Sequence, residues 1–189
     1  NREYYASWFG VSTNIDDNSP LIQNALNVMP NNSVLIFSPG TYSCKQTIRI
    51  PDSNANSVKS ISLKGLIDLN HNPTILSYTG VNPIYPTPFI DFRGRTGDKI
   101  YIGSIKSLGF RGLGSNSNIA CLWFGSNCKN TLFEHLNINS FKYGIQIDGH
   151  YYHCKINNVL FYNCDYGFRG MSIANGASFY GCHFASCNI

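Results

Sequence analysis

Three stretches in the C-terminal half share one pattern of apolar residues, and this pattern decides the fold. They are residues 133–141 (FEHLNINSF), 156–164 (INNVLFYNC) and 179–187 (FYGCHFASC), so the interval between their first residues is constant. Apolar residues stand at the first, fourth, sixth and ninth positions of each, and residues 105–113 (IKSLGFRGL) are an earlier copy. A fixed period, here of about 23 residues, is the sequence signature of a solenoid.

The spacing within each copy is that of a β-strand. Leu136 and Ile138 alternate with polar neighbours, so their side chains share one face of a pleated strand. Strands this short cannot bury that face alone, but stacked coils can. We therefore expect an all-β fold, a right-handed single-stranded parallel β-helix over residues 58–189. In that fold Leu136, Val159 and Cys182 lie in single file inside the coils.

The composition fits stacked coils. Charged residues make up 13% of the chain, whereas an average domain has about 25%, and the chain contains 23 Asn and 20 Ser. Matching positions of successive coils lie about 4.8 Å apart, where like charges repel and Asn or Ser side chains can hydrogen-bond. We expect one such polar turn column at Ser140, Asn163 and Ser186. An apolar column beside it should point inward: Leu113, Phe141, Cys164 and Cys187.

Charge and cysteine usage exclude several function classes. The net charge of the chain is +4, and its Lys and Arg residues form no basic stripe. No run of apolar residues approaches the length of a membrane span. We therefore expect neither nucleic acid nor a membrane as partner. The seven cysteines include no CxxC pair, so we expect reduced, buried thiols and no metal or other cofactor. Neighbouring Cys164 and Cys187 are close enough for a disulfide, but their column is more simply explained as core.

The N-terminal part departs from the repeat. Residues 1–57 are predicted to form a capping segment and a first coil, with a short amphipathic helix over about 20–28 that covers the open end of the solenoid. Residues 70–97, which contain four prolines, are predicted to protrude as a long loop from the coils of 58–189. The chain ends in mid-coil, so we expect the natural polypeptide to continue beyond residue 189.

The N-terminal segment also carries a family signature. Residues 9–11 (FGV), 16–26 (DDNSPLIQNAL) and 34–42 (VLIFSPGTY) resemble the opening of the pectate-lyase-like superfamily. The resemblance is nearest to the branch found in bacteriophage tailspikes and capsule depolymerases, and it covers about residues 8–50. In place of the family's usual threonine step this chain has Asn18-Ser19-Pro20.

The resemblance implies a homotrimer on the virion tail that binds or cleaves a bacterial capsular polysaccharide or lipopolysaccharide. The reduced cysteines fit folding in the reducing cytoplasm of the host better than secretion. Because the same opening precedes enzymes and pure binders, two alternatives stay open. One is a non-enzymatic carbohydrate-binding adhesin or structural β-helix. The other is a cellular polysaccharide lyase of the pectate-lyase type.

Three carboxylates are candidates for catalysis. Glycoside hydrolysis usually needs two carboxyl groups, and acidic residues are sparse in the coils. Glu134, Asp148 and Asp165 are the candidates. Each also has a structural explanation: Glu134 shares a column with Lys106 and can form an ion pair, while Asp148 and Asp165 stand where turns begin.

Aromatic residues suggest where a sugar could bind. Aromatic faces pack on the apolar faces of sugar rings, and polar side chains bind the hydroxyl groups. The candidates are two tyrosines in a His-Tyr-Tyr cluster and three residues on the expected outer wall: Tyr151, Tyr152, Tyr162, Arg169 and Tyr180. Exposed aromatic residues could equally contact a neighbouring subunit.

Overall fold

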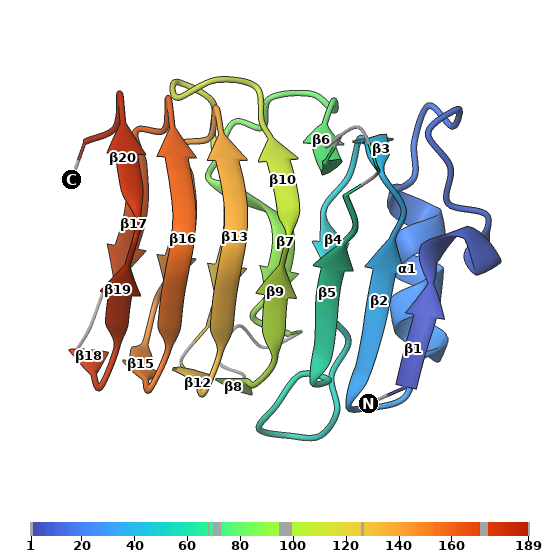
Figure 1. The fold of residues 1–189 in the computed structure, drawn as a ribbon, viewed down its shortest axis with the longest axis horizontal. Coiled ribbons are helices and arrows are strands. Elements are labelled where there is room, and N and C mark those ends of the chain that lie inside the picture. The colour runs from blue at the N-terminus through green and yellow to red at the C-terminus, as the bar shows by residue number, and fades with distance from the viewer. Residues whose placement is uncertain are drawn as a thin grey trace.

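The chain winds as a right-handed parallel β-helix, which confirms the fold class expected from the repeat (Figure 1). A computed structural model describes residues 2–67, 69, 73–94, 100–125, 127–170 and 174–188. In these ranges, strands of successive coils pair in parallel to form three sheets of eleven, five and four strands. We name them the long, middle and short sheets.

The long sheet has two segments joined by a corner. The first contains β1 (Arg2–Tyr5), β2 (Ser33–Phe37), β5 (Ile61–Gly65), β9 (Ser104–Lys106) and β19 (Ser178–Tyr180). The second contains β3 (Gly40–Cys44), β6 (Thr74–Tyr78), β10 (Leu108–Arg111) and β20 (His183–Ala185). The strands β13 (Leu132–Asn139) and β16 (Lys155–Tyr162) run through both segments.

The other two sheets complete each coil. The middle sheet contains β4 (Ile48–Arg49), β7 (Thr87–Phe92), β11 (Ile119–Phe124), β14 (Tyr143–Ile147) and β17 (Tyr166–Gly170). The short sheet contains β8 (Ile100–Tyr101), β12 (Asn127–Lys129), β15 (His150–Tyr152) and β18 (Ala174–Asn175). The remaining described elements are the 3-10 helix η1 (Ala6–Phe9) and the helix α1 (Ser19–Val28).

The register of the strands matches the repeat. Leu136 pairs with Val159, and Tyr143 pairs with Tyr166, so each residue lies beside the one that follows it by one period. Cys182 lies between β19 and β20, both of which pair with β16, and it packs against the core. The predicted single file of these side chains is therefore present.

Residues in the left-handed backbone conformation turn each corner of the coil. They fall into three columns with φ between 47° and 68°: Ser107, His135, Asn158 and Gly181; Ser140, Asn163 and Ser186; Asn130, His153 and Gly176. Asn, Ser and Gly tolerate this conformation better than β-branched residues do. The backbone N–H of Ser140 donates to the carbonyl of Tyr162 in the next coil, at 3.0 Å. The hydrogen-bond ladder thus continues through the corner.

The predicted polar turn column forms hydrogen bonds along the axis. The Nδ2 of Asn163 donates to the Oγ of Ser140 across one coil step, at 3.1 Å. Inside the coils, aromatic rings stack in the same direction. The rings of Phe92 and Phe124 lie 4.4 Å apart and nearly parallel, and those of Phe161 and Phe184 lie 4.8 Å apart.

The cysteines are core residues. All seven are free, and five of them are buried. Burial raises the pKa of the Cys44 and Cys164 thiols to about 12, so both stay protonated at neutral pH. The backbone N–H of Cys164 donates to the Sγ of Cys187 at 3.4 Å.

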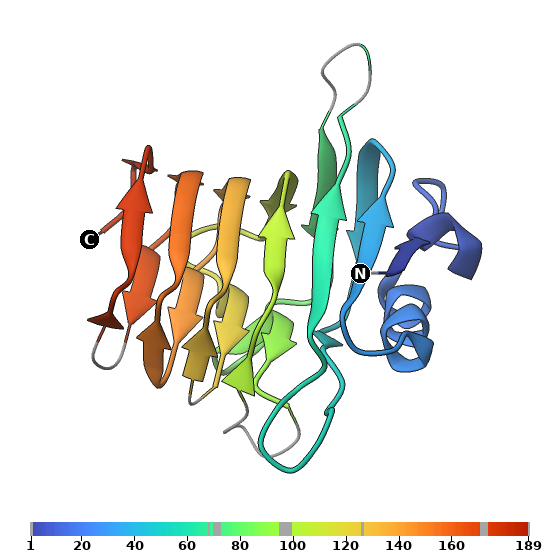
Figure 2. The same ribbon diagram turned by 60° about the horizontal axis from the view of Figure 1, so that its bottom comes forward.

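The N-terminal segment covers one end of the stack, where α1 lies beside β1 (Figure 2). Ile22, Ala25 and Leu26 of α1 are buried in the core. The Gln23 carboxamide accepts from the backbone N–H of Arg49 at 2.8 Å and donates to its carbonyl at 2.9 Å. This side chain therefore occupies the place of a neighbouring strand at the edge of β4. Unpaired edges invite aggregation, so this contact protects the first coil.

Two sequence-based expectations are wrong. The expected loop at about 70–97 contains two strands of the coils, β6 and β7; residues 70–72 and 95–97 lie outside the described residues. Among the described residues of this range, the connection 79–86 leaves the sheets and carries the prolines at 83 and 86, and residues 93–94 leave them after β7. Leu113 is 42% exposed, because it follows the end of β10 and does not continue the inward column.

The corner column yields a prediction about stability. Asn163→Val should lower the free energy of unfolding by about 2 kcal/mol, because valine is strained at positive φ and the bond to Ser140 is lost. Asn163→Gly should cost less, because glycine keeps the conformation and loses only the hydrogen bond. The matched control is Asn157→Val within β16, where φ is not positive. Urea unfolding measures all three, and equal losses at both positions would contradict the argument.

Candidate functional site

A row of polar and aromatic side chains crosses the middle sheet on its outer face. Strand pairing places Arg49, Asp91, Trp123, Gln146 and Arg169 at one register, one residue per coil. The neighbours of the first four along the strands are buried aliphatic and aromatic residues of the core, whereas Arg169 lies between Gly170 and the partly buried Phe168. We call these five residues the middle-sheet row.

Asp91 is the buried charge of the row. Its side chain is 1% exposed, and its Oδ2 accepts from the Nε of Arg49 at 3.1 Å. Its Oδ1 accepts from the Nε of Arg93 at 3.0 Å and from the backbone N–H of the same residue at 2.9 Å. Both carboxylate oxygens are thus engaged. Two guanidinium groups compensate the buried charge, which would be strongly unfavourable alone.

Trp123 links Arg93, a partner of Asp91, to a second carboxylate. The Arg93 guanidinium lies 4.2 Å from the centre of the Trp123 ring, a cation–π contact. The indole Nε1 donates to the Oδ2 of Asp148 at 2.6 Å, and the Nε2 of Gln146 donates to its Oδ1 at 2.7 Å. Asp148 is exposed, so these two donors hold a carboxylate in a fixed orientation at the surface.

Aromatic and basic side chains extend the row toward the last coils. The rings of Tyr143 and Tyr166 lie 5.8 Å apart, and the Arg169 guanidinium lies 4.9 Å from the Tyr143 ring. Tyr166 is 39% exposed. The Oε1 of Gln146 is buried and has no hydrogen-bond partner among the described residues. Buried oxygen atoms without a hydrogen-bond partner are rare because they lower the stability of the fold, so the row contains one locally unfavourable group.

The chemistry of this face is that of binding more than of bond cleavage. Retaining glycosidases place two carboxyl groups about 5–5.5 Å apart, and inverting ones about 6.5–9.5 Å apart. Of the two carboxylates here, Asp91 is enclosed by two arginines and cannot reach a substrate. Asp148 can accept hydrogen bonds from sugar hydroxyls, and Tyr166 offers an aromatic surface.

The structure does not bring the three predicted catalytic residues together. Glu134 lies in β13 of the long sheet, and its Oε2 is 3.3 Å from the Nζ of Lys106. Asp148 follows the end of β14, whereas Asp165 precedes the start of β17, at the opposite end of the middle sheet. The Oδ1 of Asp165 accepts from the Nδ2 of Asn188 at 3.0 Å.

The predicted sugar-binding residues are also spread over three sheets. Tyr151 lies in the short sheet and packs edge-on against Phe168 and the core. Tyr152 lies in the same strand, 5.4 Å from the Nζ of Lys129. Tyr162 and Tyr180 lie in the long sheet, 47% and 74% exposed. Among the five, only Arg169 belongs to the middle-sheet row.

Sequence reasoning missed Arg49, Asp91, Arg93 and Trp123 as members of one site. Gln146 and Arg169 are separated by one period of the repeat, but the interval between Asp91 and Trp123 is longer than that period. A signal was available in β7 and β11, where Asp91 and Trp123 interrupt runs of smaller or apolar side chains.

Among the described residues there is no group of three or more His, Cys, Asp or Glu side chains that could hold a metal ion. No helix in that same part of the chain has the length and apolar character to cross a membrane.

Comparison with solved structures identifies the class of fold. The chain is similar to ORF18 of Geobacillus virus E2, with a TM-score of 0.59 and 17% identity over 98% of this chain. It is also similar to a proposed glycosyl hydrolase of Parabacteroides merdae ATCC 43184, with a TM-score of 0.57 and 15% identity over 97% of this chain and 96% of the other. An iota-carrageenase complexed to iota-carrageenan fragments gives a TM-score of 0.54 and 19% identity over 95% of this chain.

These likenesses establish the fold that the pectate-lyase-like signature implied. The chain spans 37% of the length of the Geobacillus virus chain and 41% of that of the carrageenase. No protein-family model and no curated protein sequence matches it.

The buried carboxylate of the row can be tested by substitution. Asp91→Asn should lower the free energy of unfolding by about 2–3 kcal/mol, because Arg49 and Arg93 lose their common anion. Asp165→Asn is the matched control, because that side chain bonds only to Asn188 among the described residues and should change stability by less than about 1 kcal/mol. Urea unfolding measures both, and similar losses would show that the Asp91 ion pairs contribute little.

Proposed function

We propose that this chain is the glycan-binding part of a phage tailspike-type protein that binds and depolymerises a bacterial surface polysaccharide. The observation that carries the proposal is the outer face around the middle-sheet row. There an oriented carboxylate, Asp148, follows the end of β14, and the next coil presents an exposed tyrosine, Tyr166, and an arginine, Arg169, in β17. A row of about 4.8 Å steps suits a polymer with repeating units.

The structural comparisons support the proposal at the level of the fold. One similar chain comes from a virus, and another was solved as a carrageenase with fragments of its polysaccharide. In the proposed complex the polysaccharide runs from coil to coil across the outer face of the middle sheet. The Asp148 carboxylate accepts hydrogen bonds from its hydroxyl groups, and Tyr166 packs against one sugar ring.

A second candidate function is that of an adhesin that binds the glycan without cleaving it. The adhesin is favoured because three carboxylates already have structural contacts: Asp91 and Glu134 form ion pairs, and Asp165 lies in a turn. If the protein is an enzyme, the partner of Asp148 comes from another subunit or from residues outside those described.

The binding proposal predicts an effect of one aromatic side chain. Tyr166→Ala should weaken binding of the protein to host capsular polysaccharide about five- to tenfold, because it removes a half-exposed ring from the proposed path of the glycan. Tyr180→Ala is the matched control, because its exposed ring lies on the long sheet and its loss should leave affinity unchanged. Biosensor titration measures both. A loss with Tyr180→Ala alone would move the glycan to the other face.

Catalysis has its own test. The protein incubated with host capsule should release new reducing ends, and Asp148→Asn should lower the rate at least about 100-fold if Asp148 takes part in proton transfer. Unsaturated uronic products, detected by ultraviolet absorbance, would identify a lyase. Binding without any shortening of the polymer would leave the adhesin and exclude the depolymerase.

A further inference from the structure

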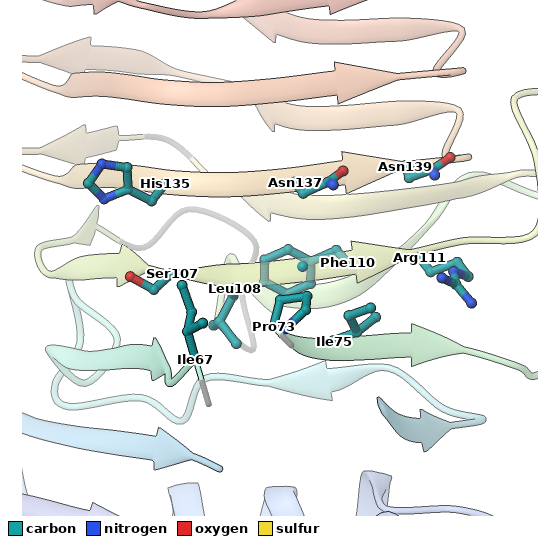
Figure 3. A pocket seen from close by; sticks show the side chains of 11 residues that line it. Ile67, Pro73, Ile75, Ser107, Leu108, Phe110, Arg111, His135, Asn137 and Asn139 are labelled. Atoms are coloured by element: carbon teal, nitrogen blue, oxygen red, sulfur yellow. The ribbon is translucent and has the colours of Figure 1, made fainter. Parts of the chain in front are cut away.

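A hollow lies on the outer face of the long sheet, away from the middle-sheet row. It is a cavity of about 140 Å³ between β6, β10 and β13 (Figure 3). Strand pairing places Ile75, Gly109 and Asn137 at one register in these three strands. Gly109 has no side chain, so the wall is open between Ile75 on one side and Asn137 on the other.

The backbone does not require glycine at this position. Gly109 is not among the residues of positive φ, unlike Gly176 and Gly181 at the corners. A Cβ built on Gly109 would lie 3.0 Å from the Cγ1 of Ile75, a tighter contact than side chains normally make, so glycine lets Ile75 pack over the strand at the edge of the hollow. Glycine within a strand weakens it and often marks a place where a ligand approaches the backbone.

The two sides of the cavity differ in chemistry. Ile67, Pro73 and Ile75 form an apolar wall, whereas Asn137, Asn139 and Arg111 present amide and guanidinium groups (Figure 3). The volume corresponds to about five water molecules, so the open cavity can take one face of a sugar ring, with the rest of the ring in solvent, but not a drug-sized ligand.

Arg111 supplies a charge that the protein does not neutralise. It is exposed, and within the described part of the chain its guanidinium forms no hydrogen bond or ion pair. Its register neighbours are Ser77 and Asn139, and the described residues that line the cavity include no Asp or Glu. Guanidinium groups bind carboxylates through two parallel hydrogen bonds, so the cavity is complementary to an anionic group.

We propose that this cavity binds one hexuronate residue of a glycan. The C–H face of the ring packs on Ile75 and Pro73, its hydroxyl groups meet Asn137, and its carboxylate binds Arg111. Arg111 lies two residues along β10 from Gly109, or about 6.8 Å, so ring and carboxylate occupy adjacent positions on one strand. The site lies on another sheet than the middle-sheet row, so it can be present or absent independently of the proposed function.

The test compares two ligands that differ only at one carbon. The isotope-labelled protein is titrated by NMR with methyl β-D-glucuronide and with methyl β-D-glucoside. The glucuronide should bind about tenfold more tightly and shift the amide signals of Gly109 and Asn137. Arg111→Gln should reduce its affinity to that of the glucoside. Gly109→Val should abolish binding of both, and circular dichroism verifies that this variant is folded.

The matched control is Arg2→Gln, which removes the same charge from β1, outside both the cavity and the middle-sheet row, and should leave glucuronide binding unchanged. Inorganic phosphate is the third probe, because it offers negative charge without an apolar face and should bind at least tenfold more weakly than the glucuronide. Equal binding of the two glycosides, no binding of either, or wild-type affinity in Arg111→Gln overturns the inference. Loss of glucuronide binding in a further variant, Arg169→Gln, but not in Arg111→Gln would overturn it too and would assign the anion to the middle-sheet row, so the two proposals can fail separately.

Discussion

The structure depends on one constraint, which is that each coil must lie directly over the preceding one. Backbone hydrogen bonds between coils run through the sheets and through the corners, as the bond from Ser140 to Tyr162 illustrates. The constraint explains both the left-handed residues at the corners and the scarcity of charge, because any side chain repeats its contacts about every 4.8 Å. Neutral amides and hydroxyls satisfy this condition, as between Asn163 and Ser140.

The same constraint determines how much of the fold could be predicted. The last coils have equal length, so the period of the apolar pattern correctly predicts Leu136 beside Val159. The earlier coils vary in length, because the connections between their strands differ while the strands stay in register. The strand β5 begins at Ile61 and β9 only at Ser104, yet the two still pair at Leu63 and Ile105. A search for a fixed period cannot find β6 and β7 inside such a coil, and for that reason the sequence predicts a loop there.

The candidate site, too, could be predicted only where its residues follow the period of the repeat. Gln146 and Arg169 follow the repeat, and the chemistry of Asp148 makes it a candidate, but nothing in the sequence connects it with its donor Trp123. The three predicted acids were each plausible alone, and the sequence contained no information that they lie on different sheets or at opposite sheet ends. Side-chain contacts such as Arg93 on Trp123 depend on how each coil bends after its strand, which the apolar pattern does not record.

The arginine side chains on the two outer faces differ in whether a carboxylate neutralises them. We interpret the neutralised arginines as structural and the other as functional. On the middle sheet, Arg49 and Arg93 form ion pairs with the buried Asp91. Apolar residues could replace this arrangement without loss of stability. On the long sheet, Arg111 has no counter-charge among the described residues and lies two positions along β10 from Gly109, over which Ile75 packs. Local departures from what stability alone favours concentrate at functional sites. The unpartnered Gln146 oxygen on the middle sheet is one such departure. A β-helix that only had to stack its coils would not need a buried oxygen of this kind.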